Sequence, residues 1–494
     1  MGLLEDAVAR LRRRGATFAD ARHVRDERET LAVRDGRVER HFAATSEGFG
    51  VRVLVASPNG GAWGFGARAG GRQDAAALEA AAEAALATAR AAASLASVVP
   101  GGARVELAEE EPQRGRFATT VARDFFAVPL ADKLALLHGV CDAMRAAAGA
   151  RARSASAHVG ARRQDKLLAT SDGTSVEQLL VHAGGGMKIV VAEGSQVAHR
   201  TYPMELDGGV AAGGWEVIEA LDFPGAAPRI AEEALALLSA PPCPAGETTV
   251  ILDTPQLALQ IHESCGHPTE SDRAFGDEVS LAGASFLTPD RLGRFRYGSR
   301  HVNLTADATT PGALGSFGWD DEGVPARKTP LVARGQFVGY LTSRETAARL
   351  GLPRSGGCLR AEAWNRFPII RMINVSLEPD PRGPSLEELV ADTDDGILMG
   401  NNKSWSIDDL RLNFQFGCEI AWEIKKGRRT RIVKNPLYGG TTPRFWSACD
   451  AVGGPEAFRM WGLLSCGKGD PMQLMAVGHG CPPARFRGIK VGSE

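Results

Sequence analysis

Helical and strand-like patterns alternate along the first 240 residues of the chain. Leu4, Val8 and Leu11 recur at helical spacing with arginines on the opposite face, which predicts a first helix. Segments rich in alanine and leucine predict three further helices, at 74–93, 131–147 and 228–238. Alternating residues separated by turn signals, Asp35-Gly36 and PNGG (58–61) among them, predict strands at 20–26, 30–40, 48–56, 62–67 and across 152–193.

A short proline-rich segment divides this pattern in two. SAPPCPAGE (239–247) predicts a boundary between an N-terminal domain, 1–240, and a C-terminal domain, 247–494. Beyond it, TTVILD (248–253) predicts a strand, PQLALQIHESCGH (255–267) predicts a helix, and many short strands and turns follow. The expected fold class is therefore α+β: an N-terminal domain of helices with antiparallel strands, and a strand-rich C-terminal domain that carries the helix of the candidate metal site.

Composition narrows the class of protein. Of the 494 residues, 44% are hydrophobic and 23% are charged, and the net charge of −2 points to neither nucleic acid nor an anionic membrane as the main partner. Eight irregularly spaced cysteines are too few for a disulfide scaffold. No apolar run approaches the ~20 residues of a membrane-spanning helix, and the first residues do not read as a secretory signal. We therefore expect a soluble cytoplasmic protein.

The segment IHESCGHPTE (261–270) carries the candidate chemistry. It contains His262-Glu263-x-x-x-His267, whereas zinc peptidases usually carry H-E-x-x-H, with the histidines four apart on one helical face. Histidines five apart lie about 140° apart around a regular α-helix, so they cannot both reach one ion. Either they are surface or capping residues, or the helix is distorted into a metal site.

Two neighbouring residues favour the distorted helix. Gly266 tolerates strained backbone, and the ring of Pro268 disfavours the α conformation for the residue before it. We expect the helix to end, or to pass through a wide π-type turn, between Ser264 and His267. Such a turn would bring His267 beside His262.

A catalytic zinc needs three protein ligands and an open position, so two histidines are not enough. Cys466, in LLSCGKGDP, is one candidate, because the neighbouring Lys468 would favour its ionised form. His479 and Cys481, in GHGCPP, are rivals. The chemistry of the residues alone does not choose among them. Cys265, between the two histidines, is expected to be a small packed residue.

These motifs resemble the TldD/PmbA family of zinc metallopeptidases, on its metal-bearing TldD side. That family carries H-E-x-x-x-H near mid-chain and a cysteine ligand in a C-G-K-type segment near the C-terminus, which singles out Cys466 over Cys481. The segment GDPMQLMAVGHGCP (469–482) departs from the family's usual G-Q-x-x-P-V-G-x-G-Q-P pattern, and this difference bears on substrate preference. Further similarities extend along nearly the whole chain, in FADARHVRDERE (18–29), GFGVRVLV (48–55), GAWGF (61–65), LATSDGTSVEQ (168–178), the segment 319–351 and INVSLEPD (373–380).

The resemblance implies a zinc metallopeptidase in which His262, His267 and Cys466 hold Zn²⁺ and Glu263 is the general base. Candidate accessory residues, for stabilising the oxyanion, are Lys468 and His479. It also implies unfolded or small peptides as substrates, enclosed in a dimer. The partner would be a second copy or a metal-free PmbA/TldE-like relative, with this chain as the catalytic subunit. An extended peptide could bind by adding to a sheet edge.

Two other functions stay open at this point. The zinc site could serve an enzyme that acts on a small molecule or a peptide-derived natural product in a biosynthetic pathway. The chain could instead be a non-catalytic peptide-binding partner, although a base beside a ligand argues against that. Three other motifs are expected to be structural: the acidic run Trp319–Gly323 as a turn with solvated or paired carboxylates rather than a second cation site, HAGGGMK (182–188) as strand or turn, and Arg428-Arg429 as a solvated hairpin loop.

Overall fold

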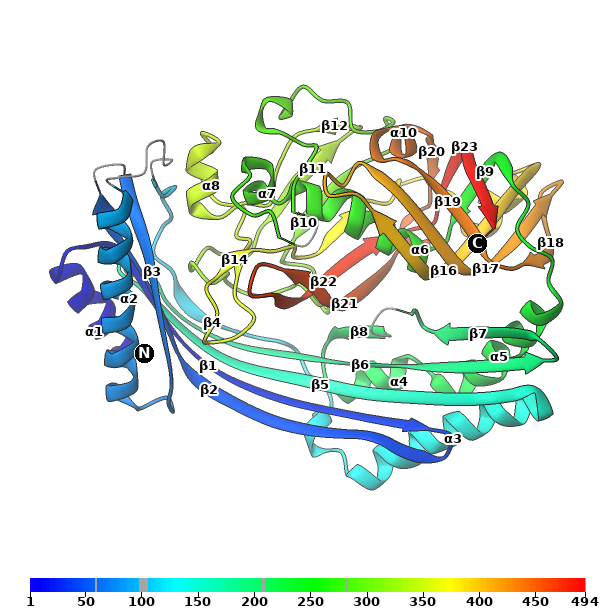
Figure 1. Cartoon of the computed structure of the whole chain (residues 1–494), viewed down its shortest axis with the longest axis horizontal. Coiled ribbons are helices and arrows are strands. Elements are labelled where there is room, and N and C mark those ends of the chain that lie inside the picture. The colour runs from blue at the N-terminus through cyan, green and yellow to red at the C-terminus, as the bar shows by residue number, and fades with distance from the viewer. Residues whose placement is uncertain (58–59, 97–104, 206–208, 281–282, 494) are drawn as a thin grey trace.

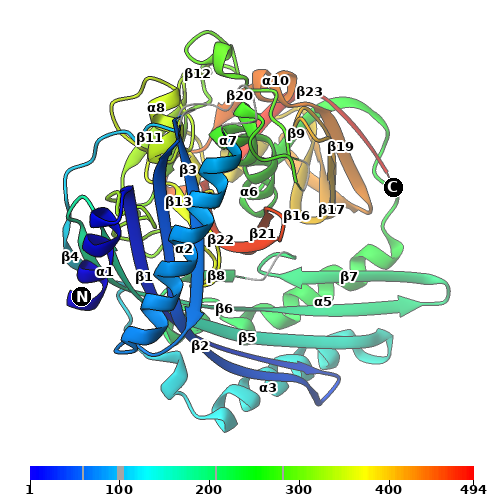
Figure 2. The ribbon, with the colours of Figure 1, turned by 60° about the vertical axis from the view of Figure 1, so that its left-hand side comes forward.

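The fold has two parts, a long curved sheet and a strand-rich C-terminal half that lies on its concave side (Figures 1 and 2). The computed structural model describes residues 1–57, 60–96, 105–205, 209–280 and 283–493. Helices and strands are both abundant and the strand pairs are mostly antiparallel, so the fold class is α+β, as predicted.

Eight strands of the described chain form the curved sheet, in the order β3-β2-β1-β5-β6-β4, with β7 and β8 both paired to β6. The four long strands each run 19 to 21 residues and pair antiparallel, which is far longer than the usual 5–6 residues. The strands are β1 (Ala16–Arg34), β2 (Arg37–Ser57), β3 (Gly60–Ala69), β4 (Arg114–Ala118), β5 (Ala152–Thr170), β6 (Ser175–Glu193), β7 (Gln196–Tyr202) and β8 (Gly209–Ala212).

The predicted strands lie inside these elements, but several of their bounds were wrong. The predicted turn at Asp35-Gly36 is present, with both residues at positive φ. The prediction at 30–40 spans the turn between β1 and β2, and the strand predicted at 48–56 begins too late, because β2 is continuous from Arg37 to Ser57. Residues 37–46 of β2 are exposed throughout, so they show no alternation of buried and exposed positions. Of the predicted turn at 58–61, residues 58–59 lie outside the described part of the chain.

The four predicted helices are confirmed, and helices pack on the convex face and at one end of the sheet (Figure 1). Alanines and leucines from α3 and α5 build one core against β5 and β6, and α1 and α2 build a second against β1 to β3. Among the described helices of residues 1–239, only the short α4 was not predicted. The helices are α1 (Gly2–Arg13), α2 (Ala75–Ala96), α3 (Leu130–Ala148), α4 (Trp215–Ala220) and α5 (Phe223–Ser239).

The C-terminal half is built on a second sheet, in the order β16-β9-β23-β19-β17-β18, with β20 paired to β23. Because β16 pairs with both β9 and β17, five of these strands close into a ring. The strands are β9 (Gly246–Leu252), β16 (Asp395–Ile407), β17 (Asn413–Lys425), β18 (Arg428–Val433), β19 (Pro436–Thr441), β20 (Cys449–Val452) and β23 (Ala484–Ser493).

Smaller elements fill the space between this ring and the curved sheet. A four-stranded sheet, in the order β12-β11-β10-β15, and the hairpin β21–β22 lie there. The strands are β10 (Leu304–Asp307), β11 (Lys328–Ala333), β12 (Gln336–Phe337), β13 (Leu359–Arg360), β14 (Ile369–Ile370), β15 (Val375–Leu377), β21 (Arg459–Lys468) and β22 (Gln473–Cys481). The helices are α6 (Thr254–Ile261), α7 (Ser271–Phe275), α8 (Arg344–Arg349), α9 (Leu386–Ala391) and α10 (Thr442–Ser447).

The acidic run Trp319–Gly323 joins the two parts. Asp321 lies 2.7 Å from Lys166 Nζ, and Glu322 lies 3.1 Å from an Arg52 nitrogen, with both partners on the curved sheet. The carboxylates are paired, as predicted, but they are buried rather than solvated. Because an unpaired buried charge is costly, these ion pairs fix the C-terminal half against the sheet.

The other two structural predictions also hold. The glycines of residues 182–188 lie inside β6. Arg428 and Arg429 are exposed at the start of β18, next to the turn after β17. No helix in the described ranges is long and apolar enough to cross a membrane.

Close packing of α2 on β3 generates a test. A Cβ on Gly66 would lie 2.1 Å from the carbonyl oxygen of Ala81, which is backbone and cannot move aside. Gly66→Ala should lower the free energy of unfolding by about 1–3 kcal/mol. Gly139→Ala, in α3, meets nothing within 4 Å and should leave stability unchanged or raise it by up to ~1 kcal/mol. Urea unfolding of both variants checks this; equal stabilities would contradict the packing.

Candidate metal centre

Helix α6 leads directly into the candidate site. Its N-terminus is capped by Asp253, whose side chain accepts from the backbone N–H of Thr254 at 2.7 Å, and Pro255 lies in the first turn. The predicted helix was too long, because α6 ends at Ile261. The backbone continues as a π-helical turn, His262–Gly266, and then as a 3-10 turn, His267–Thr269.

The π-helical turn resolves the five-residue spacing. The backbone N–H of His267 donates to the carbonyl of His262, which is the i→i+5 bond of a π-helix. Residues five apart therefore stand on the same side of the chain. The two imidazole rings lie 4.8 Å apart, centroid to centroid, and are nearly perpendicular, at 86°.

The reasons the sequence offered for this turn were wrong. Gly266 has an ordinary helical φ of −64°, and His267 stays in the α region, at φ −60° and ψ −44°, despite Pro268. The glycine is required for space instead: a Cβ on Gly266 would lie 2.0 Å from the sulfur of Met372. The width of the turn, not strained backbone, brings the histidines together.

Hydroxyl groups satisfy the carbonyls of the widened turn. Tyr297 Oη donates to the carbonyl of Ser264 at 2.7 Å, and Thr269 Oγ1 lies 2.9 and 2.8 Å from the carbonyls of Cys265 and Gly266. Cys265 is buried against Tyr297, as expected of a packed residue, and burial raises the pKa of its thiol to about 12. The π turn is therefore supported by side chains from inside and outside the segment.

Cys466 meets the two histidines from a distant strand. One ring nitrogen of each histidine and the Cys466 sulfur all lie within 4.8 Å of one another, and the sulfur is 3.8 Å from His267 Nε2. The pairing of β21 with β22 shifts by one residue between Leu463 and Cys466, so β21 contains a β-bulge. Side chains three apart on a regular strand point to opposite faces, but the bulge lets Leu463 and Cys466 line one cavity.

A relay of hydrogen bonds fixes the tautomer of His262. His479 Nδ1 lies 2.9 Å from the carbonyl of Val375, which can only accept, so Nδ1 carries the proton. Burial holds the pKa of His479 well below its usual value, so the ring is neutral and its Nε2 accepts from His262 Nδ1 at 2.8 Å. The lone pair of His262 is thereby left on Nε2. His479 stands behind His262 rather than in the cavity.

His267 is oriented by a carboxylate. His267 Nδ1 lies 3.0 Å from Glu270 Oε2, which also accepts from Arg273 Nε at 2.8 Å. Burial raises the pKa of Glu270, but Lys468 and His267 outweigh it and hold the pKa well below its usual value. The ionised carboxylate accepts a hydrogen bond from Nδ1–H of His267, which leaves the lone pair on Nε2, towards Cys466. Burial also lowers the pKa of His267 to about 4, so the ring is neutral at pH 7.

Lys468 does not have the role that its position in the sequence suggested. It is fully buried, and its Nζ lies 2.8 Å from Asp272 and 3.4 Å from Glu270. The cation that favours the Cys466 thiolate is Arg371: burial raises the pKa of this thiol, but Arg371 and His267 together bring it below its usual value. Sequence reasoning missed Arg371, which lies 95 residues from Cys466 and has no motif of its own.

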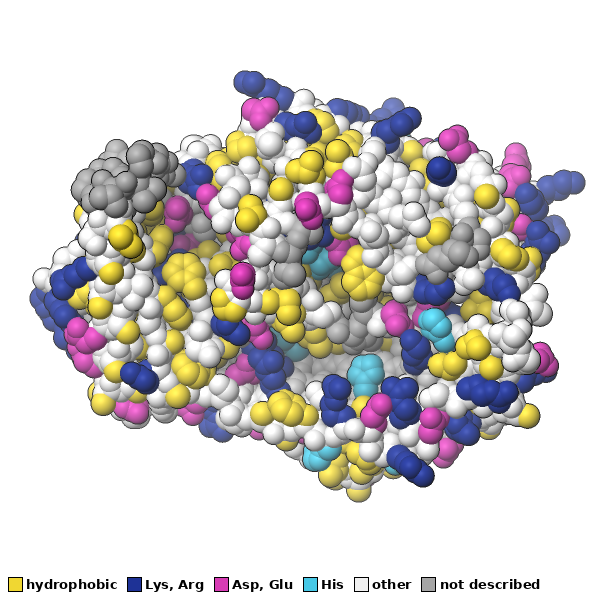
Figure 3. Space-filling view, in the orientation of Figure 1, with side chains coloured by type: hydrophobic (Ala, Val, Ile, Leu, Met, Phe, Trp, Pro, Cys, Tyr) yellow, Lys and Arg dark blue, Asp and Glu magenta, His cyan; other side chains and the backbone are white. Residues whose placement is uncertain are grey.

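Glu263 lines a cavity of about 500 Å³ together with both histidines and Cys466. Its carboxylate is buried and paired with the guanidinium of Arg411, at the end of the β16–β17 connection. Lys468, His479 and Cys481 do not line this cavity. The end of β16 and the turn of the β21–β22 hairpin contribute the exposed part of the lining, and Figure 3 shows a central hollow on this face with histidine, hydrophobic and charged side chains around it.

Comparison with known proteins gives the class of this site. The domain profiles of one family match three stretches: PmbA/TldA metallopeptidase domain 1 at residues 19–89, the central domain at 123–239 and the C-terminal domain at 245–493. The chain belongs to the PmbA/TldD family of metallopeptidases, as the motifs predicted.

Individual relatives agree with this assignment. A metalloprotease of Synechocystis sp. is 31% identical over 490 residues, covering 97% of this chain and 95% of the relative. A zinc metalloprotease TldD homologue of Saccharolobus solfataricus is 26% identical over 251 residues, covering 50% of this chain and 52% of the relative. The crystal structure of TldE from Thermococcus kodakarensis has the same fold, with a TM-score of 0.76 and 18% identity over 99% of both chains.

Thiol reactivity tests the environment of Cys466. The pKa of Cys466 lies below its usual value, whereas burial raises those of Cys141 and Cys243 to about 11 and of Cys358 to about 12. Because the thiolate is the reactive form, iodoacetamide at pH 7.5 should modify Cys466 first in native, metal-free protein. Peptide mapping by mass spectrometry measures the order of modification. Labelling of the other cysteines before Cys466 would contradict this environment.

Proposed function

We propose that the chain is a zinc-dependent metallopeptidase that hydrolyses unfolded or small peptides. The observation that carries this proposal is the convergence of His262, His267 and Cys466 beside Glu263 in one cavity. His262 comes from the π turn, His267 from the 3-10 turn that follows it, and Cys466 from a strand about 200 residues later, so only the tertiary fold brings the cysteine to the histidines. Relatives named metalloproteases support the same class of activity.

The three side chains fit a zinc ion. Nitrogen and sulfur ligands at ~2.0–2.3 Å from one tetrahedral ion lie roughly 3.3–3.6 Å from each other, so atoms within 4.8 Å need only small movements. A neutral imidazole with its free lone pair on Nε2 and a thiolate are the forms that bind metal. Bound zinc would supply Lewis-acid chemistry, polarising a carbonyl and lowering the pKa of water to ~7.

Glu263 is the proposed general base. It follows a ligand directly in the chain and lines the cavity, so it can take the proton of the attacking water and pass it to the leaving amine. The ion pair with Arg411 fixes the position of the carboxylate. Lys468 and His479 are too deeply buried to stabilise an oxyanion, which leaves Arg411 as the cation that faces the reacting atoms.

The proposal includes a dimer. The cavity is lined by residues of the C-terminal half, and a second subunit over its mouth would restrict access to flexible peptides. The fold shared with TldE is the reason for proposing a metal-free PmbA/TldE-like relative as the partner, with a homodimer as the other arrangement. Native mass spectrometry of the chain alone and mixed with such a relative distinguishes the two.

The first test separates metal binding from turnover. Glu263→Gln should retain one zinc per chain and lose ~10²–10⁴-fold in kcat on unstructured peptides, because the base is lost while the ligands stay. Glutamine also preserves a hydrogen bond to Arg411, whereas Glu263→Ala would leave that buried charge without its carboxylate. Glu387→Gln, on the exposed face of α9, is the control. Zinc analysis together with a peptide-digest assay checks this. Wild-type rates in Glu263→Gln would show that Glu263 is not the general base.

A second test concerns the residue behind the ligand. His479→Ala should weaken zinc binding ~10–100-fold, because His262 loses the acceptor that fixes its tautomer. His479→Gln should recover much of the affinity, since its amide can accept from His262 and donate to the carbonyl of Val375. Competition with a chromophoric chelator measures the affinities, with His41→Ala, on exposed β2, as control. Unchanged affinity in His479→Ala would contradict the relay.

If zinc-loaded protein, alone and with its partner, cleaves no unstructured peptide, the activity lies elsewhere. An enzyme of natural-product maturation would then be the better proposal, since the 469–482 segment departs from the family pattern. This segment supplies Met472 to the cavity mouth and His479 behind the candidate ligand His262, so its difference reaches both the substrate side and the metal side of the site.

A further inference from the structure

Large apolar side chains are exposed on the two hairpins that flank the metal-site cavity, β16–β17 and β21–β22. Trp405 is 46% exposed and Met472 is 51% exposed, and both line the cavity mouth. Large side chains of these types are usually buried, and a contiguous exposed group marks a binding site. The same two hairpins carry three more of the exposed large hydrophobic residues in the described chain, Leu410, Leu464 and Leu474.

Apolar surface continues from the mouth towards the candidate ligands. Leu259, on α6, and Leu463, on β21, are buried in the wall, and Ile407 lies at the end of β16. The cavity volume of about 500 Å³ falls within the ~300–1,000 Å³ of typical ligand pockets. A side chain entering from the mouth would therefore stay in contact with hydrocarbon until it reaches the ligands.

Charged residues contribute little to the lining of this cavity. Among the lining residues that the structure describes, Glu263 and Arg411 are the only Asp, Glu, Lys or Arg, and they pair with each other. An acidic or basic side chain would lose its hydration here without finding an opposite charge of its own. The cavity thus discriminates against charged side chains as well as favouring apolar ones.

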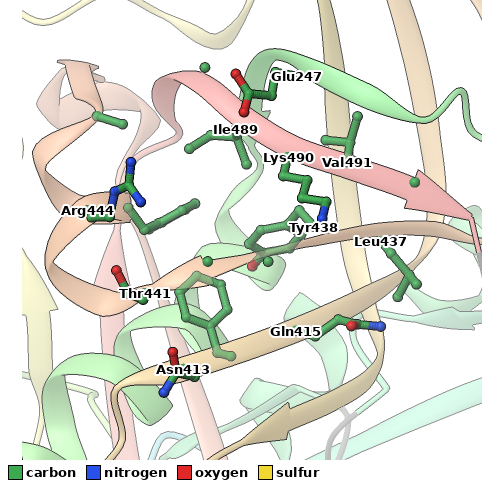
Figure 4. A pocket seen from close by; sticks show the side chains of 17 residues that line it. Glu247, Asn413, Gln415, Leu437, Tyr438, Thr441, Arg444, Ile489, Lys490 and Val491 are labelled. Atoms are coloured by element: carbon green, nitrogen blue, oxygen red, sulfur yellow. The ribbon is translucent and has the colours of Figure 1, made fainter.

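A larger cavity, on the second sheet, offers no such discrimination. It is an open groove of about 730 Å³ on β17, β19 and β23, and Figure 4 shows Glu247, Arg444 and Lys490 around it together with Leu437 and Tyr438. Its lining mixes both charges with apolar and glycine residues, and none of the candidate ligands lies there. Apolar residues that continue from the mouth to the candidate ligands are found in the metal-site cavity and not in this groove.

We propose that Trp405 and Met472 select the substrate: they bind a bulky apolar side chain, such as phenylalanine, leucine or methionine, adjacent to the scissile bond. This inference rests on the proposed peptidase function. The flexible thioether of Met472 adapts to different apolar shapes, and the indole of Trp405 supplies a rigid flat surface. The selection is therefore for apolar bulk rather than for one residue type.

Matched peptides test the selection. Two unstructured fluorogenic peptides differ only in Phe or Ala at the position next to the scissile bond. Wild-type, zinc-loaded protein should cleave the Phe peptide at least ~10-fold better in kcat/KM. Trp405→Ala/Met472→Ala should bring this ratio down to about one while zinc content stays at the wild-type level. Leu130→Ala, an equally exposed apolar residue on the remote α3, should keep the wild-type ratio.

A binding measurement separates this inference from the proposed function. Calorimetric titration of Glu263→Gln with the same peptides should give at least ~10-fold tighter binding of the Phe peptide, lost when Trp405→Ala/Met472→Ala is added. If wild-type protein cleaves neither peptide but this binding preference is present, peptidase activity fails and apolar selection stands. Equal cleavage of both peptides, or equal binding of both, overturns the selection.

The competing assignment for the exposed side chains is contact with a partner subunit. Native mass spectrometry of Trp405→Ala/Met472→Ala distinguishes the two. An unchanged assembly with altered selectivity supports substrate binding. A shift from dimer to monomer with the wild-type selectivity ratio overturns the proposal and assigns these residues to a subunit interface.

Discussion

The whole site depends on one widened turn of backbone. A regular α-helix would point the two histidines in directions about 140° apart, and only an i→i+5 turn puts residues of this spacing on one side. Such a turn is intrinsically poor in backbone hydrogen bonds, so it persists because its surroundings complete them. Tyr297 and Thr269 supply the hydroxyls, and Met372 occupies the space that a side chain on Gly266 would need. The geometry of the candidate site is therefore a property of the packed C-terminal half rather than of the motif alone.

Around this turn, a neighbouring side chain orients or ionises each of the three candidate metal ligands. His479 holds His262, Glu270 holds His267 and Arg371 favours the thiolate of Cys466. The first two contacts leave the lone pair of each imidazole on Nε2. Arg371 instead favours the ionised form of the thiol through its positive charge. The imidazoles are thus aimed before any ion arrives, which reduces the reorganisation that binding requires.

The sequence predicted the local parts of this arrangement well. Helices such as α2 and α3 follow from runs of alanine and leucine, and the existence of a distorted helix follows from the spacing of His262 and His267. The choice of Cys466 came from resemblance to a family, not from physical reasoning. Arg371, Arg411 and Glu270 could not be foreseen, because single charged residues give no signal until the fold brings them together. The continuous β2 was missed for a related reason, since a strand exposed on both faces leaves no periodic pattern.

The β-bulge beside Cys466 has a consequence for how such sequences diverge. One additional residue in β21 sets which face the cysteine occupies, since side chains alternate along a strand. A deletion of a single codon between Leu463 and Cys466 would preserve the identity of all three donors and yet turn the sulfur to the opposite face. The site can therefore be lost in evolution without substitution of any candidate ligand. The length of this segment is as informative as the cysteine itself about whether a relative keeps the site.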